Sequence, residues 1–363
     1  MRLALIASLV SPIREPQRGG AQSFLADLAT GLARRGHEVD VFAASRSEID
    51  GACVVDVGID ASTLHEFLYR AGSPPPVDLA PFVAAYARLF DAVGERPYDV
   101  VHNHAFDAPA IRCAVGIAAP VIHTLHLPPE DSIIHALRDA SQAPSPPVIA
   151  TVSTAQADAW RRFVDIDTVL PVGVVTKPIP WSATPGAGAV FAGRFSPEKG
   201  AVDAIAIARR AGMSIGLYGD AYDDGYAERE VHAASGQPGV SVHPAVPRAM
   251  LWRVMARAAA VLCPANWDEP FGLVAAEAQA CATPVVAYRR GGLQDIVLDG
   301  VTGFLVAPGD IDAAAAALGR VAELDRTACR KHAEAHLDIE AVLDAHERMY
   351  RGVLTSDVAA AHG

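Results

Sequence analysis

The sequence has few of the features that mark secreted or nucleic-acid-binding proteins. Its cysteines lie far apart and contain no CxxC pair, which predicts reduced thiols in the core of a cytoplasmic protein. Basic residues number only 30 against 42 acidic ones, for a formal net charge of -12, and such a surface repels phosphate backbones. We therefore expect no nucleic-acid partner. The cysteines are Cys53, Cys113, Cys263, Cys281 and Cys329.

Long apolar runs are also missing. The stretch from Leu3 to Val10 follows Arg2 and resembles the start of a signal peptide, but it is too short to span a membrane. Because it leads into a Pro/Gly loop and an amphipathic helix, we interpret it as a buried first strand. No strongly basic amphipathic helix is present, since Arg34 and Arg35 form only a pair, so we expect no stable membrane association.

The chain is long and apolar enough for two globular domains. It has 363 residues, of which 51% are hydrophobic. A helix at 21–33, with Phe24, Leu25, Leu28 and Leu32 on one stripe, precedes a strand at 38–44, which makes a β-α-β unit. A Pro- and Gly-rich stretch at 171–188 interrupts this alternation. We predict an α/β fold of two doubly wound parallel sheets, with domains at 1–175 and 176–340 and a C-terminal helix with a frayed tail at 341–363.

Two loops that follow predicted strands carry residues suited to anions. Gly19 and Gly20 precede a helix, where backbone N–H groups can approach a phosphate, although glycine pairs at turns often serve the turn alone. The full G-x-G-x-x-G pattern is missing, which argues against a nicotinamide dehydrogenase. Arg194 and Lys199 share one strand-to-helix loop and would suit a diphosphate, or else form a solvated basic loop. The residues alone do not decide between these two interpretations.

The segment from Cys263 to Ala280 is the most informative. Glu269 lies just before a helix predicted to start near Phe271, and Glu277 lies two turns along it among apolar residues. Burying a carboxylate is costly unless it is paired, and the two hydroxyls of a ribose would satisfy both of its oxygens. The backbone amides of Phe271, Gly272, Leu273 and Val274 at the predicted helix start are donors for sugar hydroxyls or phosphate.

Taken together, these motifs resemble those of the retaining glycosyltransferases of family 4. That resemblance implies the GT-B architecture, in which two Rossmann-like domains face a central cleft. It spans the chain from near residue 1 to near residue 310. The matching segments are Gly19-Gly-Ala, Arg35-Gly-His-Glu-Val39, His102-Asn-His104, Ala192 to Gly200, Glu269-Pro-Phe-Gly-Leu-x-x-x-Glu277, and Pro284-Val-Val-Ala with Gly291-Gly292.

The resemblance implies a role for each donor-site residue. Arg194 and Lys199 would grip the donor diphosphate and stabilise the leaving group, Glu277 would bind the ribose, and Glu269 would face the donor sugar. The amides of Phe271 to Val274 would hold its hydroxyls and phosphates. Gly20, beside Gly19, would contact the phosphate or the acceptor.

The resemblance also places residues of other loops. His126 matches a histidine near the anomeric carbon, with a structural strand-end histidine as the alternative, and His104 is a weaker candidate for the same place. The loop from His243 to Val246 would meet the nucleobase, mostly through backbone groups.

The resemblance further implies the substrates. A sugar would pass from a UDP- or GDP-sugar to a hydroxyl of an acceptor, with retention and without a metal ion or other cofactor. Because no strongly basic amphipathic helix is present, we expect a small, soluble acceptor rather than a lipid. Asp165-Ile-Asp167 and Asp310-Ile-Asp312 spell the metal motif of another glycosyltransferase architecture, but their positions favour capping. The N-terminal domain would choose the acceptor, with His65, Tyr69 and Arg70 as candidate lining residues.

Other functions remain open from the sequence alone. A non-catalytic nucleotide-sugar binding protein would need Arg194, Lys199 and Glu277 but neither His126 nor Glu269. A GT-B epimerase or phosphorylase is the enzymatic alternative. Departures from the family pattern at Leu170 to Thr176, at Gly219 to Gly225 and after Gly292 weaken any donor-specific prediction.

Overall fold

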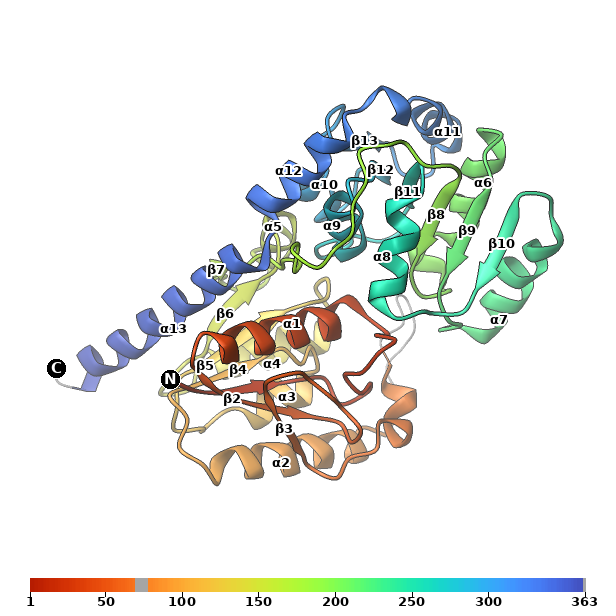
Figure 1. The fold of residues 1–363 in the computed structure, drawn as a ribbon. Helices are drawn as coiled ribbons and strands as arrows, with labels where there is room; N and C mark the ends of the chain where they lie inside the picture. Colours follow the sequence, from red (N-terminus) through yellow and green to blue (C-terminus); the bar gives the residue numbers. More distant parts are fainter. Residues whose placement is uncertain (69–77, 362–363) are drawn as a thin grey trace. The chain divides into compact units, whose positions relative to one another are not determined.

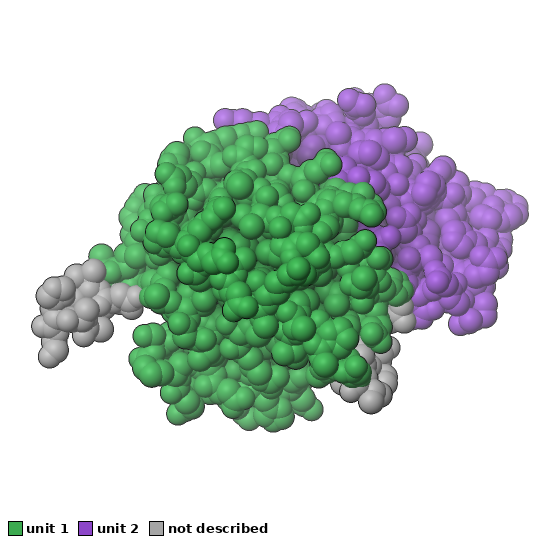
Figure 2. Space-filling model, turned by 90° about the horizontal axis from the view of Figure 1, so that it is seen from below, with its two compact units in different colours: residues 1–14, 21–171, 339–363 green, residues 15–20, 172–338 purple. Residues whose placement is uncertain are grey.

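The computed structural model describes residues 1–68 and 78–361, and it divides into two compact units (Figure 1). The first unit comprises residues 1–14, 21–171 and 339–363, and the second comprises residues 15–20 and 172–338 (Figure 2). Residues 15–20, which include Gly19 and Gly20, therefore group with the second unit.

The first unit is built on a seven-stranded parallel sheet with the order β3-β2-β1-β4-β5-β6-β7. The chain runs outward from β1 in one direction and then outward from β4 in the other. The boundary between β1 and β4 is thus the switch point of this sheet. The strands are β1 (Arg2–Ile6), β2 (Glu38–Ala43), β3 (Cys53–Asp56), β4 (Val100–Asn103), β5 (Val121–Leu125), β6 (Val148–Thr151) and β7 (Thr168–Val169).

Helices cover the two faces of this sheet. They are α1 (Gly20–Arg34), α2 (Ala80–Gly94), α3 (Ala108–Cys113), α4 (Asp131–Ala140), α5 (Thr154–Trp160) and α13 (Ile339–Ala361), with a 3₁₀ segment at Ala61–Phe67. The predicted apolar stripe of α1 is confirmed, because Phe24, Leu25, Leu28 and Leu32 are all buried. The C-terminal helix α13 packs on the first unit, where Arg35 pairs with both Glu340 and Asp344.

The second unit has a six-stranded parallel sheet with the order β10-β9-β8-β11-β12-β13. Its switch point lies between β8 and β11. The strands are β8 (Ala189–Ala192), β9 (Ile215–Tyr218), β10 (Val240–His243), β11 (Ala260–Cys263), β12 (Val285–Tyr288) and β13 (Gly303–Val306).

The helices of the second unit enclose its core. Ala189, Phe191, Ile215 and Leu217 alternate along β8 and β9 and pack against α6 and α11. The helices are α6 (Ala201–Arg210), α7 (Asp224–Tyr226), α8 (Arg248–Ala256), α9 (Leu273–Ala280), α10 (Leu293–Ile296), α11 (Ile311–Gly319) and α12 (Arg326–His336). Short 3₁₀ or π segments lie at Pro197–Lys199, Ala227–Val231, His232–Gly236 and Val321–Glu323.

The predicted fold class is confirmed, since both units are parallel α/β sheets wound in two directions. Several local predictions were wrong. The first strand ends at Ile6, because residues 7–10 continue as a buried loop. The cysteines are all free, but only Cys281 and Cys329 are buried, whereas Cys53 is exposed at the edge strand β3 and Cys113 and Cys263 are partly exposed.

The switch point of the second sheet brings two loops into backbone contact. Gly200 has a φ of 75°, and a Cβ at this residue would lie 1.9 Å from the carbonyl oxygen of Pro264, which follows β11. Only glycine permits both this backbone conformation and this approach. The loop that carries Lys199 is therefore fixed against the loop that leads to Glu269.

We predict that Gly200→Ala lowers the free energy of unfolding by about 2–4 kcal/mol, because it adds a backbone clash to left-handed strain. Gly212 has a φ of 66°, and nothing lies within 4 Å of the place that a Cβ would take there. Gly212→Ala is therefore the control and should cost about 1 kcal/mol. Calorimetric melting of both variants measures the difference. Equal losses in the two variants would show that the contact with Pro264 does not constrain the loop.

Candidate donor and sugar site

Glu269 is held in place by the glycine pair that follows β12. A Cβ on Gly291 would lie 2.3 Å from the carbonyl oxygen of Glu269, and a Cβ on Gly292 would lie 2.6 Å from that of Pro270. The backbone N–H of Gly292 donates to the carbonyl of Glu269 over 2.7 Å. Because Gly291 and Gly292 have no side chains, this turn can pack directly against the backbone of residues 269–271 and support it.

Lys199 and Glu269 form an ion pair at the switch point of the second sheet. The ammonium lies 2.7 Å from Oε2 and 3.1 Å from Oε1 of the carboxylate, and Trp267 Nε1 also donates to Oε2 over 2.7 Å. Burial raises the pKa of Glu269, but the charge of Lys199 and the hydrogen bonds from Lys199 and Trp267 outweigh it, so the pKa lies below its ordinary value. Glu269 is therefore ionised at neutral pH.

Arg194 lies in the same loop as Lys199 and also faces a carboxylate. Its Nη2 is 3.4 Å from Oε1 of Glu198, which in turn accepts a 2.7 Å hydrogen bond from the hydroxyl of Ser196. The guanidinium carbon lies 4.1 Å from the centroid of the Tyr222 ring. A stacked, partly paired guanidinium has a defined direction, which suits the binding of a diphosphate.

Glu277 is buried on α9, with 4% of its side chain exposed, and its partner is Arg248 at the start of α8. Arg248 Nε donates to Glu277 Oε1 over 3.0 Å, and the guanidinium carbon lies 5.1 Å from the Trp252 ring centroid. The sequence-based expectation that a buried carboxylate here needs a partner is thus met within the protein.

The helix that follows Glu269 begins later than predicted. α9 starts at Leu273 rather than near Phe271, and Gly272 precedes it in a left-handed conformation with a φ of 103°. The carbonyl of Gly272 accepts from the amides of Ala275 and Ala276. The amides of Leu273 and Val274 are consequently the first of the helix, which have no intrahelical acceptor, whereas Phe271 is buried ahead of it.

The loop predicted to meet a nucleobase follows β10. The His243 ring stacks on Tyr218, its partner on β9, with centroids 4.6 Å apart and planes 16° apart. Its Nε2 lies 3.1 Å from the hydroxyl of Ser241. Val246 is partly exposed in the loop before α8. The stacked and partly exposed rings of His243 and Tyr218 thus lie beside the loop whose backbone we expect to contact the nucleobase.

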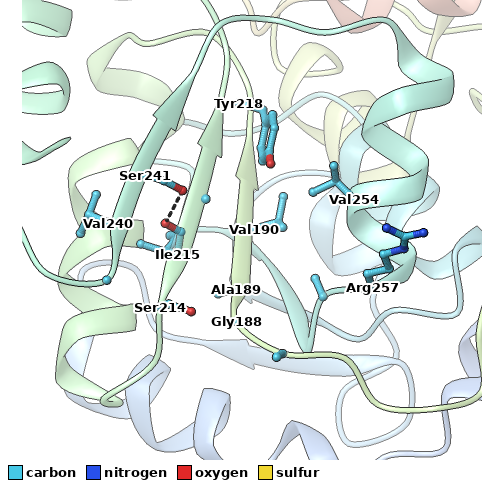
Figure 3. A pocket seen from close by; sticks show the side chains of 14 residues that line it. Gly188, Ala189, Val190, Ser214, Ile215, Tyr218, Val240, Ser241, Val254 and Arg257 are labelled. Carbon is cyan, nitrogen blue, oxygen red and sulfur yellow. Dashed lines mark hydrogen bonds between the residues drawn. The ribbon is translucent and has the colours of Figure 1, made fainter.

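A cavity of about 510 Å³ lies in the second unit and shares Tyr218 and Ser241 with the surroundings of His243 (Figure 3). Strands β8, β9 and β10 form its floor, with Ser214 at one end and Tyr218 at the other, and Val254 and Arg257 of the α8 region form a wall. Lys199, Glu269 and Glu277 do not line it. Because ligands of parallel sheets bind beyond the carboxyl ends of the strands, we do not assign the donor to this cavity.

In the first unit, His104 and His126 follow the neighbouring strands β4 and β5 and lie in direct contact. Nδ1 of His104 is 3.0 Å from Nε2 of His126, and both rings lie near Phe24. Burial, together with the positive charge that His346 would carry, lowers the pKa of His126 to about 3. His126 is therefore a neutral imidazole at neutral pH.

These two histidines belong to a larger buried group. His102 Nδ1 lies 2.8 Å from the Tyr350 hydroxyl of α13 and its Nε2 lies 2.7 Å from the Thr124 hydroxyl. Burial lowers the pKa of each member, to about 4 for His123 and His346 and well below the ordinary value for His102 and His104. The folded unit thus keeps five imidazoles in their neutral form.

The two Asp-x-Asp motifs have structural partners. Asp310 caps α11 by accepting from the amide of Ala313, as predicted, whereas Asp167 accepts from the amide of Ile149 beside β6 and caps no helix. In residues 1–68 and 78–361, no group of three or more His, Cys, Asp or Glu side chains is placed to hold a metal ion. No helix within those ranges is long and apolar enough to cross a membrane.

The structure adds partners that the sequence analysis missed. Glu198 lies in the loop that carries Arg194 and Lys199, so the sequence did contain a signal for it: a carboxylate between two cations. Arg248 gave no such signal, because it lies 29 residues before Glu277 in the sequence. His65 is exposed in its 3₁₀ segment, and Tyr69 and Arg70 lie outside the described residues.

Comparison with known proteins places this chain in a class. A family model described as Glycosyltransferase Family 4 matches residues 18–177, and one described as Glycosyl transferases group 1 matches residues 184–336. A D-inositol 3-phosphate glycosyltransferase of Xylanimonas cellulosilytica is 32% identical over 357 residues, which cover 84% of each chain.

Solved structures agree on the fold. Sucrose-phosphate synthase from Thermosynechococcus elongatus superimposes with a TM-score of 0.78 at 21% identity, covering 98% of this chain and 99% of the other. Alr3699/HepE of Anabaena, in complex with UDP-glucose, superimposes with a TM-score of 0.75 at 19% identity, covering 98% of this chain and all of the other. The fold is GT-B. The chain belongs to glycosyltransferase family 4 and is an enzyme of the hexosyltransferase type.

We predict that acid selectively destabilises the first unit through its buried histidines. Their folded pKa values lie below the unfolded value of about 6.5, so their contribution to stability is complete above that pH and is lost as the pH falls. Below that pH, each histidine that stays neutral in the folded state should lower the free energy of unfolding by about 1.4 kcal/mol per pH unit. His346→Phe should therefore reduce the drop in melting temperature between pH 7.5 and 5.5.

His135, which is exposed on α4, supplies the control variant His135→Gln. This substitution should leave the pH dependence of the melting temperature unchanged. If His346→Phe and His135→Gln gave the same pH dependence as the unmodified chain, the buried histidines would not be the cause of acid sensitivity.

Proposed function

We propose that the enzyme transfers a sugar, with retention, from a nucleoside-diphosphate sugar to a hydroxyl of a small acceptor. The observation that carries this proposal is the convergence of Lys199, Glu269 and Arg194 at the switch point of the second sheet. Two cations on one rigid loop suit a diphosphate, and α9 begins in the same segment, four residues after Glu269. UDP- or GDP-sugars are the donors of choice in this proposal.

The leaving group is the part of the reaction that these residues serve. When the bond to the sugar breaks, negative charge builds on the nucleoside diphosphate, and Arg194, Lys199 and the first amides of α9 stabilise it. In this scheme the two cations take the role that a divalent metal has elsewhere, so no metal is required. The acceptor hydroxyl attacks from the face that the diphosphate leaves, which retains the configuration.

Binding of the donor is assigned to the remaining residues. Glu277 receives the ribose hydroxyls, with Arg248 fixing the direction of its carboxylate. Glu269 faces the donor sugar, and the amides of Leu273 and Val274 receive the sugar hydroxyls and the phosphates. His243 and Val246 border the base, Gly19 and Gly20 offer backbone N–H groups to the phosphate, and His126, as a neutral imidazole, contacts the donor sugar. The names of the relatives, which refer to D-inositol 3-phosphate, support a small polyol-type acceptor.

We predict that Glu277→Gln weakens donor binding about 10-fold or more, since a hydrogen bond to a charged group contributes about 1.5–3 kcal/mol. Glutamine can still accept from Arg248, so the fold is preserved. Calorimetric titration with UDP-, GDP-, ADP- and dTDP-sugars measures the effect, and Glu228→Ala, at an exposed position, is the control. If none of these sugars binds the unmodified chain, the proposed function is wrong; unchanged binding by Glu277→Gln would remove only the ribose assignment.

The leaving-group role has its own test. Arg194→Ala combined with Lys199→Ala should lower the rate of donor hydrolysis or transfer at saturating donor at least 100-fold, which is about 2.7 kcal/mol at the barrier. Lys177→Ala removes an exposed cation of the same unit and should leave the rate unchanged. Hydrolysis that survives in the double variant would contradict the role.

A further inference from the structure

At the switch point of the first sheet, Ser8 follows β1 and Asp107 follows β4. Asp107 occupies the N-cap position of α3, but its side chain does not cap the helix. Ala110 and Ile111 donate instead to the backbone carbonyl of Asp107, and Pro109 has no N–H to offer. The carboxylate is thus not used by the helix it precedes.

Two buried hydroxyls hold this carboxylate in one direction. The Tyr86 hydroxyl of α2 and the Ser8 hydroxyl, 2.9 Å away, both donate to Oδ2 of Asp107. Tyr86 is itself fixed, because its hydroxyl accepts from the backbone N–H of Leu9 over 3.3 Å. Among the described residues Oδ1 accepts no hydrogen bond, and Asp107 is partly exposed. The arrangement presents an oriented acceptor oxygen at the place where parallel sheets bind ligands.

The surroundings of Asp107 carry negative charge. Burial raises the pKa of Asp107 to about 6, and the charge of Glu130, which caps α4 after β5, acts in the same direction. His104, which follows β4, is neutral and has a buried Nε2 for which no hydrogen-bond partner is found in residues 1–68 and 78–361. The two carboxylates favour a ligand that donates hydrogen bonds, and the neutral His104 adds no positive charge that would attract a phosphate.

We propose that Asp107 is a specificity-determining residue that accepts a hydrogen bond from a hydroxyl or ammonium group of the acceptor and excludes a phosphate from that position. This inference rests on the proposed function, because it names the class of acceptor for the same transfer. It separates this chain from relatives whose names specify a phosphorylated inositol.

The test compares three probes in the presence of saturating UDP. The probes are myo-inositol, D-glucosamine and D-inositol 3-phosphate, and saturation-transfer NMR titrations of the full chain give their dissociation constants. Asp107→Asn is the central variant, because its amide oxygen can still accept from Tyr86 and Ser8 while the charge is removed. Ser8→Ala, which keeps the charge, is the second variant, and Asp139→Asn, exposed on α4, is the matched control.

The unmodified chain should bind myo-inositol or D-glucosamine at least 10-fold more tightly than D-inositol 3-phosphate. Asp107→Asn should narrow that preference at least fivefold at an unchanged melting temperature. Ser8→Ala should weaken binding of the preferred probe, and Asp139→Asn should change neither the preference nor the melting temperature.

Three results would overturn the proposal: equal or tighter binding of D-inositol 3-phosphate, no binding of either myo-inositol or D-glucosamine, or an unaltered preference in Asp107→Asn. A purely structural role would move the melting temperature and leave the preference unchanged. UDP titration in the same samples reports separately on the proposed function.

Discussion

The ion pair between Lys199 and Glu269 is the constraint around which the second unit is organised. It joins the loop after β8 to the loop after β11 across the switch point of the sheet. Glycine makes this junction possible on both sides, since Gly200 meets the carbonyl of Pro264 and Gly291 meets the backbone of Glu269. The start of α9 and the position of Arg194 follow from the same two loops.

The two units present different electrostatic environments at their switch points. In the second unit each cation faces a carboxylate, Arg194 with Glu198 and Lys199 with Glu269, so an anionic ligand meets oriented charges in a chain whose net charge is -12. In the first unit the five buried histidines are neutral, and Asp107 supplies a negative charge. A diphosphate suits the oriented charges of the second unit, and a ligand that donates hydrogen bonds suits the carboxylate of the first unit.

Local sequence patterns predicted those features of the fold and the site that depend on residues close together in the sequence. The apolar stripe of α1, both parallel sheets, the loops with Arg194, Lys199 and Glu269, and the helix with Glu277 were all predicted in this way. Contacts between distant segments could not be found, because no periodicity links Arg248 to Glu277. Asp107 shows a second limit: an aspartate before Ala-Pro-Ala has the pattern of a helix cap, and only the three-dimensional positions of Ser8 and Tyr86 reveal another use.

A crystal structure of the chain with a bound UDP-sugar would show directly where the donor lies. We predict that the diphosphate lies within hydrogen-bond distance of Arg194, Lys199 and the first amides of α9, and that the ribose lies against Glu277. A diphosphate bound in the cavity over β8, β9 and β10, or a ribose that makes no contact with Glu277, would contradict this assignment of the donor site.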